Sequence, residues 1–220
     1  MRRLLLLRPE PGLSASAERA REMGLDVLLC PLFRVEPVAW AIPDPGDYDA
    51  LLLTSANAVR LGGHRLAELS ALPVHAVGTA TAAAAEEAGL RVERVGRGGL
   101  ADALAALPGS LRLLHLAGED RTDVQGPHRI DARTVYRSRP IADPHLPSLE
   151  GLVAAVHSPR AGARLAELAD TRRHTAIAAI SAAAADACSD GWERIEAAEM
   201  PDDPSLLALA ALLCHTSPPR

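Results

Sequence analysis

The sequence predicts an α/β protein made of two doubly wound parallel-sheet domains, joined by a two-stranded linker, with a cleft between them. Short apolar runs alternate with segments of helical spacing, as expected of parallel strands that are covered on both faces. Glycine or hydroxyl residues mark most points where a strand leads into a helix. Two other segments, 33–38 and 134–140, alternate apolar with polar residues and carry a proline near their ends, which is typical of exposed linker strands rather than of sheet interior.

At the start of the chain, Leu4–Leu7 is predicted as a strand, and the helix that follows it covers about 14–23. Ser14 is the expected N-cap of that helix, and Gly24 is its expected C-terminal stop. Asp26–Cys30 is the second predicted strand, and the first linker strand follows it.

The middle of the chain repeats this strand-and-helix unit. The expected strands are Tyr48–Leu53, Val74–Val77, Val92–Val95 and Arg112–Leu116. Helices are expected to begin at Thr54 and Gly78 and to cover Leu100–Leu107. Gly126-Pro127 excludes a helix before the second linker strand.

After the second linker strand the cycle resumes. The expected strands are Leu152–Val156, Ala176–Ile180 and Ile195–Ala197, and helices are expected after Ser158, Ser181 and Asp202-Asp203. If the linker strands pair, the chain leaves one domain, builds a second and returns. We therefore expect a discontinuous domain of residues 1–34 and 140–220, an inserted domain of residues 36–134, and linker strands at 33–38 and 134–140.

Composition excludes several functions. The chain has 220 residues and a net charge of −5, its 23 basic residues are all arginine, and aromatic residues make up 2%. A Schiff-base or P-loop lysine is therefore impossible, and a receiver-like signalling domain lacks the lysine it needs. The chain has too few aromatic side chains to stack the bases of single-stranded nucleic acid. Its net negative charge also disfavours binding to DNA phosphates. We expect no nucleic-acid partner.

No metal site is expected. Three distant cysteines form no CxxC pair, and the eight histidines include no HExxH motif. The apolar run at 4–7 is too short for a signal peptide, and the run at 206–214 is too short to span a bilayer. We expect a cytoplasmic monomer with no membrane partner.

Hydroxyl side chains recur where strands lead into helices. They belong to Thr54-Ser55, Thr79, Thr81, Ser158 and Ser181. Because these turns lie at the carboxyl edge of a parallel sheet, where ligands bind, their amides and hydroxyls can hold an anion without fixed positive charge. Ordinary N-capping is the alternative for each of them. Four such turns in two facing domains favour an anion-binding cleft.

Three more side chains are candidates at this edge. Arg8 follows the first strand, with a plain surface arginine as the alternative. Arg121 follows Gly118-Glu119-Asp120, with a salt bridge to either acid as the alternative. Tyr136 lies on a linker strand, where its phenol can donate a proton to a leaving hydroxyl; packing of the linker is the alternative.

Other polar residues are assigned structural roles. Asp202-Asp203 is interpreted as a helix-start cap rather than as half of a metal site. His115 and His157 are interpreted as core or edge histidines rather than as catalytic groups.

At these residues the sequence resembles the uroporphyrinogen-III synthase family. The resemblance covers nearly the whole chain in order, and TSANAVR, VGTATA and VYR are together its most specific motifs. The stretches that carry it are LLLLRPEPG (4–12), VLLCPLFRVEP (27–37), YDALLLTSANAVR (48–60), LPVHAVGTATAAAAEEAG (72–89), LHLAGEDR (114–121), TVYRSRP (134–140), VHSPRAGARL (156–165) and AEMPDDPSLLALAAL (198–212).

The resemblance implies a cofactor-free, cyclising lyase that acts on a small molecule. Linear hydroxymethylbilane, a polycarboxylate, would lose water and close to uroporphyrinogen III with inversion of ring D, through a spiro intermediate. Tyr136 matches the group that assists departure of the hydroxyl. The substrate-binding set, from the family match and the turns together, is Arg8, Ser55, Asn57, Gly78, Thr79, Thr81, Arg121, Ser158 and Ser181. The alternative is a non-catalytic, two-domain module that binds a small polyanion.

Overall fold

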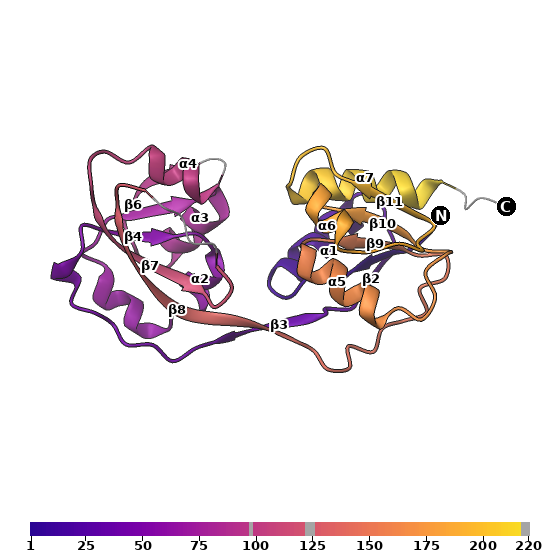
Figure 1. Cartoon of the computed structure of the whole chain (residues 1–220), viewed down its shortest axis with the longest axis horizontal. Helices are drawn as coiled ribbons and strands as arrows, with labels where there is room; N and C mark the ends of the chain where they lie inside the picture. The colour runs from indigo at the N-terminus through magenta and orange to yellow at the C-terminus, as the bar shows by residue number, and fades with distance from the viewer. Residues whose placement is uncertain (97–98, 122–125, 217–220) are drawn as a thin grey trace. The chain divides into compact units, whose positions relative to one another are not determined.

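The computed structural model describes residues 1–96, 99–121 and 126–216. The chain divides into two compact units: unit 1 contains residues 1–34 and 139–220, and unit 2 contains residues 35–138. Each unit is built on a parallel-dominated sheet with helices on both faces (Figure 1), so the predicted α/β fold class is confirmed. Within the described residues, no helix is long and apolar enough to cross a membrane.

Unit 1 is built on a five-stranded parallel sheet in the order β11-β10-β9-β1-β2. Its strands are β1 (Leu4–Leu6), β2 (Val27–Leu29), β9 (Val153–Val156), β10 (Ala176–Ala179) and β11 (Arg194–Ala197). Its helices are α1 (Gly12–Glu22), α5 (Pro159–Leu168), α6 (Ala182–Asp186) and α7 (Asp203–His215). The three central strands are buried along their whole length, which is why they appear in the sequence as unbroken apolar runs.

The helices of unit 1 cover the two faces of its sheet in pairs. On one face Leu13 of α1 belongs to the same core cluster as Leu206 of α7. On the other face Leu165 of α5 belongs to a cluster with Ala184 of α6. This alternation is what makes the unit doubly wound.

Unit 2 is built on a six-stranded sheet in the order β3-β8-β7-β4-β5-β6, in which β4 to β8 pair in parallel. Its strands are β3 (Phe33–Pro37), β4 (Ala50–Leu53), β5 (Val74–Val77), β6 (Val92–Gly96), β7 (Arg112–Gly118) and β8 (Arg129–Pro140). The first two residues of β3 and the last two of β8 belong to unit 1, so these two strands connect the units. Its helices are α2 (Ala56–Leu61), α3 (Thr79–Glu87), α4 (Leu100–Ala105) and the short 3-10 helices η1 (Pro45–Asp47) and η2 (His64–Leu69). Helices α2 and α3 cover one face and α4 the other.

The start of α1 differs from the prediction. The helix begins at Gly12, after Pro11, and has no side-chain cap. Ser14 is therefore inside the helix, and its Oγ donates to Oε1 of Glu10 over 2.7 Å. Proline fixes φ near the helical value, so it started the helix before the serine that was expected to cap it. Gly24 follows the end of α1 with φ of +79°, as expected of a C-terminal glycine stop.

The strand expected at 134–140 also differs. It begins at Arg129 as β8 and pairs with β7 from Arg129 to Tyr136. Its neighbour on the other side is β3, so the two predicted linker strands lie next to each other in the sheet. Within the stretch 134–140 only Val135 is fully buried. The alternating pattern arose because β8 has one side of mostly polar, half-covered residues. Residues 122–125, part of the segment expected to lack a helix, lie outside the described residues.

Candidate functional site

The strand order of each sheet reverses at one point. In unit 1 the reversal lies between β1 and β9, and in unit 2 it lies between β4 and β7. Helices leave such neighbouring strands toward opposite faces, and the crevice beyond their carboxyl ends is where open parallel sheets bind ligands. Arg8 follows β1, Ser158 follows β9 and Ser55 follows β4, so three predicted site residues lie at these reversal points.

In unit 1, a buried carboxylate organises the side chains at the reversal point. Arg8 donates from Nη1 to Oδ1 of Asp203 and to Oγ of Ser16, each over 2.9 Å. Ser16 donates to the same Oδ1 over 2.6 Å. Arg19 donates to the other oxygen, Oδ2, from Nε at 3.0 Å and Nη2 at 2.6 Å. The Arg8 guanidinium also lies against Gly12, where a Cβ would approach it to 2.5 Å.

His157 completes this cluster. Its Nε2 lies 2.8 Å from Oδ1 of Asp203, and its side chain is only 7% exposed. Burial lowers the pKa of His157, opposed by its hydrogen bond with Asp203, so the ring is neutral near pH 7. We therefore assign the proton to Nε2, which donates to the carboxylate. The other nitrogen, Nδ1, has no hydrogen-bond partner within the described part of the chain.

The charge on Asp203 is strongly favoured. Burial by itself would raise the pKa of this carboxyl, but hydrogen bonds from His157, Ser16 and Arg19 outweigh it and hold the pKa far below its usual range. The sequence pattern predicted that Asp202 and Asp203 together form a helix-start cap. The cap is in fact Asp202, whose Oδ1 accepts from the amide of Ser205 over 2.8 Å. Asp203 instead binds His157 and Arg8, which are 46 and 195 residues away in the sequence. No local sequence pattern reveals contacts of that range.

The three predicted serines are N-caps. Oγ of Ser158 accepts from the amide of Ala161 over 3.2 Å, and Oγ of Ser181 accepts from that of Ala184 over 3.3 Å. Oγ of Ser55 accepts from the amide of Asn57, in the first turn of α2, over 3.2 Å. A capping hydroxyl uses only acceptor capacity, so each serine retains a hydrogen that can be donated to an anion.

Helix α3, unlike the helices that these serines cap, begins without a side-chain cap. Its N-cap is Gly78, at φ of +85°, which has no side chain to accept from the first turn. The amide of Gly78 donates to the carbonyl of Gly96 over 3.0 Å. Thr79 is exposed and Thr81 is buried. A helix that starts without a side-chain cap presents amide donors at the positive end of its dipole, which is an arrangement that binds anions.

Tyr136 lies against the end of β7. A Cβ on Gly118 would come within 2.8 Å of its Cζ and 3.0 Å of its Oη, so only glycine admits the ring there. The carbonyl of Tyr136 accepts from the amide of Glu119 over 2.9 Å, which fixes the backbone as well. Close by in the sheet, Oγ1 of Thr54 lies 3.0 Å from Nε2 of the buried His115. Strand β8 thus brings the phenol against the carboxyl end of β7, one of the two strands at the reversal point of unit 2.

Arg121 lies beyond β7, at the same edge. Its Nη1 donates to Oγ1 of Thr134 over 3.2 Å, and its side chain is exposed. The predicted residues therefore form two groups within separate units. Unit 1 holds Arg8, Ser158 and Ser181, and unit 2 holds the others. Within residues 1–96, 99–121 and 126–216, no group of three His, Cys, Asp or Glu side chains is placed to hold a metal ion.

Comparison with known proteins adds a family match. A family model described as uroporphyrinogen-III synthase HemD matches residues 14–208. No curated protein matches the chain significantly. The crystal structure of uroporphyrinogen-III synthetase from Helicobacter pylori is 16% identical, with 97% of this chain and 100% of that chain covered and a TM-score of 0.68. A mutant uroporphyrinogen III synthase from Thermus thermophilus is 20% identical, with 97% and 99% covered and a TM-score of 0.53. At these identities the two structures show a shared fold.

Proposed function

The chain belongs to the uroporphyrinogen-III synthase family, and we propose that the reversal points of its two sheets hold the carboxylates of linear hydroxymethylbilane. Members of the family are cofactor-free lyases that close this bilane to uroporphyrinogen III, with loss of water and inversion of ring D. The observation that carries the proposal is that Arg8, Ser158 and Ser55 lie at those two points, with Tyr136 beside the carboxyl end of β7.

The binding groups suit a polycarboxylate in an acidic chain. With a net charge of −5, general attraction cannot hold the substrate, so local donors must do so. The first-turn amides of α3, the hydroxyl hydrogens of Ser55, Ser158 and Ser181, and the guanidinium of Arg8 supply them. Asp203 keeps Arg8 oriented but also offsets its charge, which favours recognition by hydrogen-bond geometry over simple charge attraction.

Tyr136 is proposed as the group that assists departure of the hydroxyl. As the C–O bond breaks, the hydroxyl takes up a proton and leaves as water, while the pyrrole nitrogen stabilises the carbon left behind. The phenol supplies a hydrogen bond or proton to that oxygen. The tight contact with Gly118 supports this role, because it fixes the direction of the ring before the substrate binds.

Incubation with freshly generated hydroxymethylbilane, followed by separation of the oxidised products, tests the proposal. Formation of the type III isomer supports it, and type I alone overturns it. The family match does not favour the alternative of a non-catalytic module, which would bind uroporphyrin-like ligands without turnover.

We also propose a cytoplasmic monomer. Support for a reducing compartment comes from the three cysteines, Cys30, Cys188 and Cys214, which are all buried free thiols. Light scattering coupled to size separation measures the mass in solution, and a mass twice that of the chain would contradict the monomer.

A further inference from the structure

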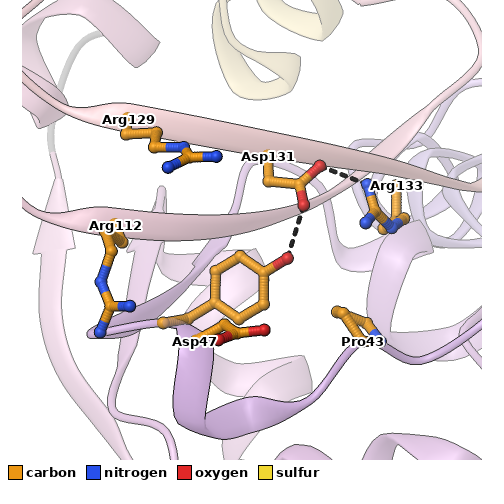
Figure 2. A pocket seen from close by; sticks show the side chains of 7 residues that line it. Pro43, Asp47, Arg112, Arg129, Asp131 and Arg133 are labelled. Carbon is orange, nitrogen blue, oxygen red and sulfur yellow. Dashed lines mark hydrogen bonds and ion pairs between the residues drawn. The ribbon is translucent and has the colours of Figure 1, made fainter.

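A polar pocket of about 380 Å³ lies within unit 2 (Figure 2). It lies toward the opposite edge of the sheet from Ser55 and Tyr136. Arg112 and Arg129 stand at the first residues of β7 and β8, so they mark the amino edge, whereas the proposed substrate site is at the carboxyl edge. The pocket is also lined by Asp47, Tyr48, Asp131 and Arg133. The proposed reaction uses none of these residues.

Two of the three guanidiniums are already matched by carboxylates. Arg133 forms an ion pair with Asp131, whose other oxygen accepts from Oη of Tyr48 over 2.5 Å. Arg112 lies 3.5 Å from Asp49, which also accepts from the Arg112 amide over 2.7 Å. The hydrogen bond from Tyr48 is the main cause that holds the pKa of Asp131 below its usual range, so this pairing persists at neutral pH.

Among the charged side chains that line the pocket, Arg129 and Asp47 differ from the paired ones just described. Neither side chain forms a hydrogen bond or an ion pair with any residue that the structure describes. Arg129 is the register partner of Arg112 on the neighbouring strand, so the two backbones are about 5 Å apart and both side chains leave the same face. The pocket therefore presents an arginine that forms no hydrogen bond or ion pair with a described residue, although its charge acts on Asp131, and a carboxylate that forms none either; Arg112 stands beside the first.

We propose that this pocket binds a small zwitterion of the amino-acid class. Its carboxylate would meet Arg129, with Arg112 beside it, and its ammonium group would meet Asp47. A simple polyanion fits less well, because Asp47 and Asp131 would repel its second charge. An unmatched pair of opposite charges on the walls of one pocket favours a ligand with the same pair in reverse.

Calorimetric titration with glycine, β-alanine, 4-aminobutyrate and 6-aminohexanoate tests the proposal, because this series varies the distance between the two charges. Butyrate and butylamine are the singly charged controls. At least one amino acid is expected to bind saturably and about tenfold more tightly than either control. Arg129→Gln and Asp47→Asn are each expected to weaken that binding about tenfold.

Arg91→Gln is the matched control variant, since Arg91 is an exposed arginine near the start of another strand of this sheet, paired with Glu93 at 3.5 Å. It should leave binding unchanged. The proposal is overturned if none of the amino acids binds saturably, if butyrate binds as tightly as the amino acids, or if Arg129→Gln behaves like Arg91→Gln. Binding is measured independently of bilane turnover, and Arg129→Gln should leave turnover unchanged. A negative binding result would therefore contradict the amino-acid site without contradicting the synthase assignment.

Discussion

Nε2 of His157 lies 2.8 Å from Oδ1 of Asp203, although 46 residues separate them in the sequence. The carboxylate that accepts from this ring also holds Arg8 and Arg19. One buried acid on α7 therefore fixes side chains from the end of β1, from α1 and from the end of β9. The arrangement of the unit 1 edge depends on that single charge.

Asp203→Asn should lower the free energy of unfolding by about 2–3 kcal/mol at pH 7, because two arginines and a histidine lose a charged acceptor in a largely buried place. Asp202→Asn is the matched control on the neighbouring residue. Asparagine caps a helix about as well as aspartate, so this change should cost about 0.5 kcal/mol or less. Urea unfolding measures both, and equal losses would show that Asp203 has no special role.

Stability should fall as the pH drops below about 6.5. The folded state lowers the pKa of His157 from its ordinary value of 6.5, mainly by burial, so it favours the neutral ring. The stability that the neutral ring of His157 contributes is fully present above the pKa that this ring has in the unfolded chain. It is lost as the pH falls, because the unfolded chain takes up the proton before the folded chain does. The folded state also lowers the pKa of Asp203, so a second loss of stability is expected below the ordinary aspartate pKa of 3.8.

His157→Gln should remove the first of these two losses, because its amide can still donate to Asp203 but does not titrate. Unfolding free energies of the two proteins between about pH 7 and pH 4.5 make the comparison. Parallel curves would show that His157 does not cause the dependence.

Tyr136→Phe should slow formation of product about a hundredfold while leaving the fold intact, since only the proton donor is lost. Tyr48→Phe is the matched control: its hydroxyl bonds to Asp131 near the other edge of unit 2, so the rate should stay near that of the parent protein. Initial rates with saturating bilane measure both. An unchanged rate in Tyr136→Phe would remove the role assigned to the phenol.

Gly118→Ala should also slow the reaction, because the new methyl group must displace the ring of Tyr136 from contacts of 2.8 to 3.0 Å. Gly99→Ala is the comparison, as nothing lies within 4 Å of a Cβ there and φ is negative. If both variants turn over bilane at the same rate, the contact does not position the ring.

Ser158→Asp separates capping from substrate binding. Aspartate caps α5 as well as serine does, so the free energy of unfolding should change by about 0.5 kcal/mol or less. Its negative charge should repel a substrate carboxylate and raise KM about tenfold. Ser158→Ala, in contrast, should cost about 1 kcal/mol of stability with a smaller effect on KM. A KM unaffected by the aspartate would leave Ser158 as a cap alone.

The fold was predictable because its central strands are buried on both faces and so appear as uninterrupted apolar runs. Leu4–Leu6 and Val153–Val156 show this most clearly. The early start of β8, at Arg129 rather than at Thr134, was not predicted, because a strand with one mostly polar, half-covered side shows no unbroken apolar run. The positions of Arg8 and Ser158 at a sheet edge followed from local turns. The grouping around Asp203 did not, because its contacts join segments that are distant in the chain.

The isomer composition of the product shows whether this protein closes the bilane with inversion of ring D. Freshly generated hydroxymethylbilane is divided between a tube with the protein and a tube without it, and the oxidised porphyrins are separated. We expect mainly the type III isomer with the protein, and the type I isomer, from unaided closure, without it. Type I isomer in both tubes, formed at the same rate, would contradict it.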